Sequence, residues 1–441
     1  MKRKFTFQLL LAVAFTAIYF LGSAQSTTFS YPNPGVLPSG QAISIVSPII
    51  SNGTINGGTL NNTAVFAGTG VSGGSNDNNP LLATFQNPDG MVKDALGNYY
   101  VAELGGKRIR KISSSGVVST IAQLSSYQPR DIAINTSNGD LYFITNVRLC
   151  RIVNSNAANY PTQAPIYNFT NESSTVVAGN GNSSNGDNTI GTSASFGDLS
   201  SLAISPDNSF IVLTDGNPTG SCPPQPARIR KVLITTNFPV STIQMCGWKN
   251  WEGITNPTGT QWACGWGIFL NTLYSKENYG SNFYPKDVMF VSNTLMYVLL
   301  ERRDFMGNDW NGFDRIVSLS FQTTTDIKYV PPGGNNPTVT TYQTYPYKWG
   351  SVIAGSSGGM TNDNYDGSST TANFDIVNAL TKDEAGNLYL LENEKVRKIT
   401  PNGHVSTIAG SIWLSSGDAV GDGINARLNA ADIYYDQAGG F

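Results

Sequence analysis

The stretch KRIRKISSSGVVSTIA, residues 107–122, determines how the rest of the chain is interpreted. Four of its first five residues are basic, which is typical of a nucleic-acid-binding arm. Related stretches recur at residues 227–243 (ARIRKVLITTNFPVSTI) and 394–410 (EKVRKITPNGHVSTIAG). A basic run that returns together with its sequence neighbourhood indicates a structural repeat rather than an isolated charged patch.

The repeat extends on both sides of this stretch. Its VSTIA-like ends recur about 55 to 65 residues apart, with one interval about twice as long, at Ala67, Ala122, Ala178, Gln244, Ala354 and Ala409. Each copy contains four short extended segments, separated by turn signals such as DALGN at 94–98. A unit of this kind cannot bury both of its own faces. The sequence therefore predicts an all-β fold, a β-propeller of four-stranded antiparallel blades.

Within RIRKI, Ile109 and Ile112 are an odd number of residues apart, which places them on opposite faces of a strand. A blade between two others has both faces covered, so this spacing fits. We expect the arginines and the lysine near strand ends, reaching water past their apolar stems and pairing with Asp or Glu of neighbouring turns. The formal net charge of −3 opposes nucleic-acid binding, so no nucleic-acid partner is expected.

The full order of motifs in a copy is DG, A-x-F, D-x-x-GN-x-Y-x-x-E/D, R-I-R-K-I and G-x-V-S-T-I-A-G. It resembles the NHL-repeat family, most strongly at residues 63–122 and 350–436. The resemblance implies a propeller, typically six-bladed, that serves mostly as a binding platform. The copy at 411–441 is incomplete. We therefore expect a six-bladed ring whose last blade is incomplete or is closed by N-terminal strands from residues 41–68.

The N-terminus has the pattern of a secretory signal peptide. Met1-Lys2-Arg3-Lys4 is basic, an apolar run follows, and Gly22-Ser23-Ala24 provides small residues for cleavage. An uncleaved membrane anchor is the alternative. The predicted organisation is a signal peptide at 1–24, a Gly/Asn/Ser-rich segment at 25–62 that could contribute a closing strand, and the propeller at 63–441. No membrane span is expected after cleavage, and the predicted location is extracellular, at the cell surface or in the periplasm.

Residues suited to catalysis are scarce, and no catalytic residue is assigned. The single histidine, His404, falls in a PNGH turn, and the sequence shows no Ser-His-Asp arrangement and no phosphate-binding loop. The sequence therefore favours a binding protein over an enzyme.

One enzymatic alternative needs only oxygen ligands. A carboxylate ends the second strand of four predicted blades, at Glu103, Asp215, Glu301 and Glu392. These four residues could surround one end of the central channel and hold Ca²⁺ for a lactonase-like hydrolysis. They could equally accept backbone hydrogen bonds or pair with RIRK segments. The Asp-Gly pairs Gly186-Asp187, Asp366-Gly367 and Asp422-Gly423 are read as ordinary turns.

The most distinctive departure from the repeat is an insertion at about 246–282. It contains four of the seven tryptophans, Trp248, Trp251, Trp262 and Trp266. Flat aromatic faces on a loop suit stacking on sugar rings or packing against a protein partner. A small satellite core is the alternative. Cys222, Cys246 and Cys264 are disulfide candidates, whereas Cys150 is expected to be an unpaired strand residue.

Together these features predict a secreted propeller that binds an extracellular glycan or protein through its rim loops. The alternatives are the Ca²⁺-dependent hydrolase and a structural module of a larger surface protein.

Overall fold

The structure is a computed structural model. It describes residues 29–30, 49–50, 66–69, 77, 79–216, 227–246, 282–303, 314–321, 324–330, 338–345, 348–355, 366–369, 371–374, 376–392, 395–410 and 430–435. The chain divides into two compact units, residues 1–63 and 64–441. In the first unit, β1 (Phe29–Ser30) pairs with β2 (Ile49–Ile50) in antiparallel fashion.

The second unit contains the repeated sheets, which we number as blades in chain order. Blade 1 comprises β3 (Pro88–Lys93), β4 (Tyr99–Glu103), β5 (Arg108–Ile112) and β6 (Val118–Gln123). Blade 2 comprises β7 (Ile132–Ile134), β8 (Leu141–Ile144), β9 (Leu149–Ile152) and β10 (Val176–Ala178). Blade 3 comprises β11 (Asp198–Ile204), β12 (Phe210–Gly216), β13 (Ala227–Leu233) and β14 (Val240–Cys246).

Blades 4 and 5 carry additional strands. Blade 4 comprises β15 (Asn282–Ser292), β16 (Leu295–Arg303), β17 (Arg315–Ser320) and β20 (Lys348–Ala354). Between its last two strands lies a separate hairpin of β18 (Thr324–Val330) and β19 (Thr338–Tyr345). Blade 5 comprises β22 (Val377–Lys382), β23 (Leu388–Glu392), β24 (Lys395–Ile399) and β25 (His404–Gly410), with β21 (Gly367–Ser368) paired outside β25. The described helices are three 3₁₀ turns, η1 (Ala157–Asn159), η2 (Ser173–Thr175) and η3 (Gly191–Ser193).

Every described blade has the predicted antiparallel order, in which consecutive strands are neighbours. The turns form where the sequence places them. In blade 1, Gly97 and Gly116 have φ values of 82° and 84°, a backbone conformation that glycine adopts without strain. The Asp94 carboxylate accepts hydrogen bonds from the backbone N–H groups of Leu96 and Asn98 at 2.9 Å, which fixes the first of these turns.

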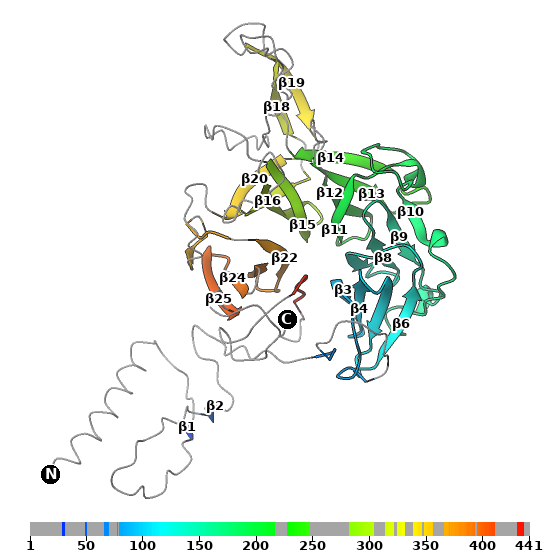
Figure 1. Ribbon diagram of the computed structural model, residues 1–441. Coiled ribbons are helices and arrows are strands. Elements are labelled where there is room, and N and C mark those ends of the chain that lie inside the picture. Colours follow the sequence, from blue (N-terminus) through cyan, green and yellow to red (C-terminus); the bar gives the residue numbers. More distant parts are fainter. Residues whose placement is uncertain are drawn as a thin grey trace, which may run out of the picture. The chain divides into compact units, whose positions relative to one another are not determined.

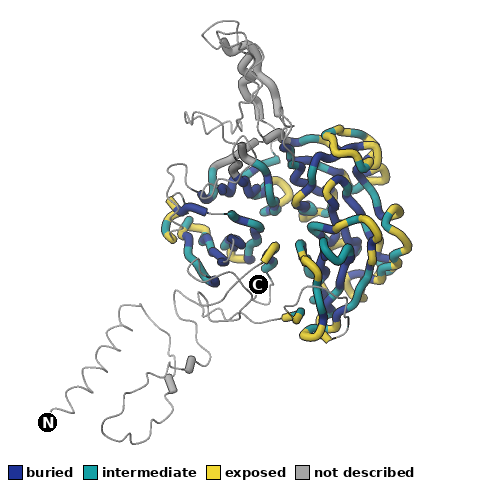
Figure 2. The backbone as a smooth tube through the Cα atoms, viewed as in Figure 1, coloured by how far each residue is buried: buried dark blue, intermediate teal, exposed yellow. Residues whose placement is uncertain are grey.

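The five blades stand around a common centre (Figure 1). Their first strands are innermost, because β3 contacts β7, β7 contacts β11, β11 contacts β15, and β15 contacts β22. Buried residues concentrate in the strands, and exposed residues gather in the connecting turns (Figure 2). The result is a ring in which each inner strand lies against the inner strands of neighbouring blades.

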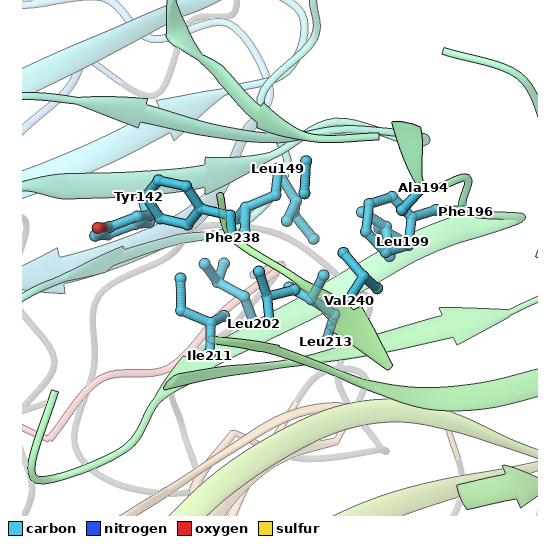
Figure 3. Packing of buried hydrophobic residues seen from close by; sticks show 13 residues of the cluster. Tyr142, Leu149, Ala194, Phe196, Leu199, Leu202, Ile211, Leu213, Phe238 and Val240 are labelled. Atoms are coloured by element: carbon cyan, nitrogen blue, oxygen red, sulfur yellow. The ribbon is translucent and has the colours of Figure 1, made fainter. Parts of the chain in front are cut away.

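Apolar side chains fill the spaces between blades. Ile109 and Ile112 are 0% and 4% exposed and belong to different clusters, which confirms that both faces of β5 are covered. Between blades 2 and 3, Tyr142 and Leu149 of one blade meet Leu199 and Leu213 of the other (Figure 3). Face-to-face packing of this kind stabilises repeats that cannot fold alone.

The prediction of six blades is wrong for the part of the chain that the structure describes, which contains five. Of the sixth copy, the structure describes residues 430–435. This segment lies beside blade 5, where Ile433 packs with Ala379 and the Tyr435 ring stacks on Tyr389 at 5.9 Å. It also reaches blade 1, where the Met91 N–H donates to Asp432 Oδ2 at 2.9 Å. It thus takes the place of an innermost strand without a described sheet of its own.

The predicted closing strands from residues 41–68 lie largely outside the described residues. Within them, Phe66 to Gly68 lie against blade 1. The Phe66 and Tyr99 rings are 5.3 Å apart, and the Gly68 N–H donates to the Pro80 carbonyl at 2.7 Å. Gly179 and Gly355 make the equivalent bonds, to Gly191 and Ser369, where one blade leads into the next. Residues 66–69 therefore take the place of the end of an outer strand preceding blade 1.

In the described ranges, no helix is both long and apolar enough to cross a membrane.

Candidate functional site

The arginines of the repeated basic stretch are internal. Arg110 on β5, Arg230 on β13 and Arg397 on β24 are each 0% exposed. The expectation that the basic residues reach water is therefore wrong for these three arginines, whereas Lys111 and Arg228 of the same stretches keep part of their surface exposed. The expected pairing with acidic residues is confirmed. Full desolvation of a guanidinium is tolerated only where its donors are satisfied by hydrogen bonds and opposite charge.

Each of these arginines pairs with the carboxylate that ends the second strand of its own blade. Nη1 of Arg110 lies 2.7 Å from Glu103, Nη1 of Arg230 lies 2.6 Å from Asp215, and Nη1 of Arg397 lies 3.1 Å from Glu392. The three carboxylates are also 0% exposed. Burial raises the pKa of Asp215, and the attraction of Arg230 opposes that shift. For Asp215, the cost of burial therefore outweighs the attraction of Arg230.

A second aspartate completes each cluster from the connection that precedes the blade. Asp77, Asp187 and Asp366 lie 2.7, 2.9 and 3.2 Å from the Nη2 atoms of the three arginines. Each also accepts hydrogen bonds from the backbone N–H and the hydroxyl of a threonine on the fourth strand, Thr120, Thr242 or Thr407. The aspartates of the Asp-Gly pairs at 187 and 366 are thus more than ordinary turn residues, because they tie the connection to two strands.

The phenylalanine of the A-x-F motif forms one wall of the same cluster. The guanidinium carbons of Arg110, Arg230 and Arg397 lie 4.9, 5.1 and 5.1 Å from the ring centroids of Phe85, Phe196 and Phe374. This is the geometry of a cation–π contact. The motifs DG, A-x-F, RIRK and the terminal carboxylate are therefore parts of one structural cluster.

Blades 2 and 4 replace the ion pair. In blade 2, Cys150 stands at the position of Arg110, because it pairs with Phe143 as Arg110 pairs with Val101 in blade 1. In blade 4, Asp287 pairs with Leu299, as Gly90 pairs with Ala102 in blade 1. The residue after Leu299 is therefore equivalent to Glu103, and this residue is Leu300 rather than Glu301. Val317 takes the place of Arg110, and Leu300 and Val317 share one apolar cluster. The two ionic partners have been replaced together.

The four carboxylates predicted as calcium ligands are not brought together. Glu103, Asp215 and Glu392 sit in three different blades, each with an arginine, and Glu301 occupies a different position in its strand. Among the residues that the structure describes, no group of three or more His, Cys, Asp or Glu side chains is placed to hold a metal ion. Calcium binding by these residues stays an untested prediction.

The tryptophan positions Trp248, Trp251, Trp262 and Trp266 lie outside the described residues, as do Cys222 and Cys264. Cys246 ends β14, but its side chain is not described. The predicted disulfide therefore stays a prediction. Cys150 is a free, buried thiol on β9, as expected, and its burial raises the pKa of the thiol to about 12.

The topology places three insertions, all in blades 3 and 4, on one face. In an antiparallel blade the first strand begins, the second ends, the third begins and the fourth ends at the same side. We call this side of the ring the upper face. Residues 217–226 join β12 to β13, residues 247–281 join β14 to β15, and residues 304–313 join β16 to β17. All three insertions are rooted on the upper face of blades 3 and 4, whereas the β18–β19 hairpin is rooted on the opposite face.

A set of polar side chains surrounds the centre of the upper face, which we call the axial polar ring. Its members stand near the start of each first strand, at Asp89, Arg130, Ser200, Lys286 and Asn378. They link neighbouring blades. Arg130 Nη1 lies 2.7 Å from Asp198, the Ser200 hydroxyl donates to the Lys286 carbonyl at 3.1 Å, and Lys286 Nζ donates to Asn378 at 3.2 Å. All five keep part of their surface exposed, so donors and acceptors of both charges face solvent at the centre of the ring. Sequence analysis did not find this ring, since its residue types differ from copy to copy.

The chain matches no protein-family model and no curated protein. Among solved structures, it is similar to a protein of unknown function from Bacteroides thetaiotaomicron, with 16% identity and a TM-score of 0.52 over 88% of this chain and 74% of that one. It also matches an auxiliary nutrient binding protein from the same organism, with 14% identity and a TM-score of 0.49 over 88% of this chain and 74% of that one. A protein of the same description from Bacteroides ovatus matches with 14% identity and a TM-score of 0.49 over 86% and 73%.

The fold defines the class of protein: the chain is a β-propeller of four-stranded antiparallel blades, with a fold similar to that of the first of these structures. At these identities the likeness concerns the fold alone, and the relation to the NHL-repeat family remains a resemblance in sequence motifs.

Proposed function

We propose that this β-propeller is exported and serves as a rigid platform that binds an extracellular glycan or protein at its upper face. The observation that carries the proposal is the placement of the insertions at 217–226, 247–281 and 304–313. All three leave and rejoin the ring at the upper face of two adjacent blades. The corresponding connections in blades 1 and 5 are residues 104–107 and 393–394.

Binding loops are commonly carried by a rigid scaffold, because the scaffold holds the ends of the loops in place and so reduces the conformational entropy that they lose on binding. Blades 3 and 4 provide such a scaffold. Their shared cluster includes Ile229, Val298 and Val317, all 0% exposed. The tryptophans of the 246–282 insertion supply flat apolar faces suited to sugar rings or to a protein hot spot. The axial polar ring on the same face supplies hydrogen-bond donors and acceptors for the polar groups of such a ligand.

A glycan array probed with the purified protein tests this proposal. We compare the wild type with Trp262→Ala in the insertion and with Leu233→Ala as a matched control. Leu233 is an exposed apolar residue at the opposite end of blade 3, where β13 ends. We expect Trp262→Ala to lose glycan binding and Leu233→Ala to keep it, and addition of a calcium chelator shows whether the binding depends on calcium.

Equal binding by both variants would place the ligand away from the insertion and contradict the proposal. If the folded wild type binds no glycan, the same pair is used in affinity capture of extracellular proteins. A partner that the wild type and Leu233→Ala capture, but Trp262→Ala does not, supports the proposal that the ligand is a protein. If no partner distinguishes the two variants, the proposal fails.

A further inference from the structure

Three aspartates occupy one equivalent position around the centre of the ring. Asp131 and Asp287 stand at this position in blades 2 and 4, and Asp432 stands there in the segment 430–435 that follows blade 5. The intervening blades carry small residues instead, Gly90, Ser201 and Ala379. We call Asp131, Asp287 and Asp432 the axial aspartates.

Each axial aspartate bridges its own segment to the next blade. One oxygen accepts the N–H of the following residue, at 2.7 Å in all three cases, from Ile132, Val288 and Ile433. The other oxygen accepts a backbone N–H of the neighbouring blade, at 2.8, 2.8 and 2.9 Å, from Leu202, Leu380 and Met91. Asp287 also accepts a hydrogen bond from the Ser201 hydroxyl at 2.6 Å. The three carboxylates therefore join blade 2 to blade 3, blade 4 to blade 5, and segment 430–435 to blade 1.

Among the residues that the structure describes, little positive charge compensates these carboxylates. The described charged groups nearest to them along the packed strands are Asp89 on β3, Arg130 before β7, Asp198 on β11 and Lys286 on β15. Arg130 is paired with Asp198 and also attracts Asp89, and Lys286 attracts Asp287. Lys93 and Lys382 stand at the far ends of β3 and β22, and segment 430–435 contains no other charged residue.

We propose that the axial aspartates form a proton-dependent clasp, which holds the three blade boundaries together when the carboxyl groups are protonated and loosens them when all three ionise. Like charges at a common centre repel, and a proton removes that repulsion while leaving oxygen lone pairs to accept the backbone N–H groups. The clasp concerns the ring itself and does not depend on the proposed function.

The electrostatic surroundings support this assignment. Burial raises the pKa of Asp131 to about 7, and the charge of Asp287 adds to the shift. Burial also raises the pKa of Asp287, against hydrogen bonds from Ser201 and neighbouring amides. Burial and the charges of the other two axial aspartates raise the pKa of Asp432 well above the ordinary value for an aspartate.

The sign of the effect follows from linkage. The folded protein binds more protons than the unfolded chain wherever the pH lies between the ordinary aspartate pKa and the raised value. Stability therefore falls as the pH rises above about 4, the ordinary pKa of an aspartate, and the contribution of Asp131 is lost as the pH passes through about 7. Burial also raises the pKa values of Asp89 and Asp215, which add to the same dependence of stability on pH, so the variants below are needed to isolate the part that comes from the axial aspartates.

Thermal unfolding of the full-length protein between pH 5 and pH 8 tests the clasp. We expect the midpoint of the wild type to fall by about 5 °C over this range. Asp131→Asn and Asp287→Asn are each expected to reduce the pH dependence, since each removes one of the three axial carboxylates and the repulsion that it exerts on the other two. Asp207→Asn is the matched control, because the hydrogen bonds of Ser205 and Ser209 lower the pKa of that turn aspartate, and it should keep the slope of the wild type.

A second measurement on the wild type covers the case in which an asparagine variant fails to fold. Hydrogen exchange corrected for intrinsic rates should show that the amides of Leu202, Leu380 and Met91 lose protection between pH 5 and pH 8. The amide of Leu213, in the middle of blade 3, should keep its protection. A midpoint that is constant or rises over this range, or boundary amides that keep their protection, would overturn the proposal.

Discussion

Replacement of Arg230 by methionine tests how the buried ionic clusters act. In the wild type, Arg230 donates to Asp215 at 2.6 Å, to Asp187 at 2.9 Å and to the carbonyls of Ser195 and Gly186 at 3.1 and 3.0 Å. Methionine keeps the apolar stem beside Phe196 but leaves Asp215, whose side chain is 0% exposed, without its counter-charge. Removal of one partner of a buried pair costs about 3 to 5 kcal/mol, a large share of the roughly 5 to 15 kcal/mol by which a protein is stable.

The pH dependence of this loss carries the sharper test. Burial already raises the pKa of Asp215 in the presence of Arg230, and removal of the guanidinium raises it further. An aspartate with a raised pKa in the folded state destabilises the fold progressively as the pH rises above its ordinary value. The cost of Arg230→Met should therefore be larger at pH 7 than at pH 5.

Urea unfolding followed by circular dichroism at both pH values measures the effect. Lys231→Met on the same strand is the control and should cost less than about 1 kcal/mol, because Lys231 is partly exposed. The double variant Asp215→Leu with Arg230→Val copies Leu300 and Val317 of blade 4 and should recover part of the loss. A cost for Arg230→Met below about 1 kcal/mol, equal at the two pH values, would refute the reasoning.

Three further predictions concern single positions. Burial opposes but does not outweigh the hydrogen bonds from Ser126, Ser125 and Tyr127, which lower the pKa of Glu172 to about 2. This contact therefore stabilises the loop above about pH 4.5 and is lost as the pH falls through about 2. Glu172→Gln should speed hydrogen exchange at residues 125–127 at pH 7, and unchanged exchange would count against this prediction. Cys150, with its raised pKa, should resist alkylation at pH 8 in the folded protein and react fully in urea, as mass spectrometry can show; rapid reaction in the native state would contradict its burial. An added Cβ at Gly90 would stand 2.6 Å from the Asp131 Cα, so Gly90→Ala should cost about 1 to 3 kcal/mol in urea unfolding. Gly216→Ala, whose nearest contact would be 3.6 Å, should cost less, and equal costs would show that the backbone at Gly90 can shift.

The sequence predicted the blades because their signals are local. Glycine turns, alternating apolar strands and a repeated spacing each specify structure over a few residues, and Ile109 and Ile112 behave as their spacing indicates. The β18–β19 hairpin was missed, because its two strands lack the motifs of the repeat against which they could be aligned. The number of blades in the described part of the chain differs from the predicted six, because ring closure depends on contacts between residues far apart in the chain, such as Met91 with Asp432.

The polar sites were harder to predict for the same reason. RIRK reads as an exposed basic run, since the sequence does not show that Phe85 covers Arg110 while Glu103 and Asp77 neutralise it. The axial aspartates fall at positions where neighbouring copies carry Gly90, Ser201 or Ala379, so an alignment of copies treats them as variation. Their common place becomes visible only when the first strands are set side by side.

Blades with and without the buried arginine alternate around the ring, and this alternation limits which blades can be deleted or duplicated. Blades 1, 3 and 5 hold a buried arginine, whereas blades 2 and 4 hold none at that place and instead present an aspartate to the next blade. The modular unit is therefore a pair of blades, not one. Deletion or duplication of a pair of blades keeps an aspartate beside a small residue at every blade boundary. Loss of a single blade would instead place two small residues side by side, from among Gly90, Ser201 and Ala379, or bring two aspartates together. Rings shortened, lengthened or recombined in the laboratory should accordingly tolerate changes in steps of two.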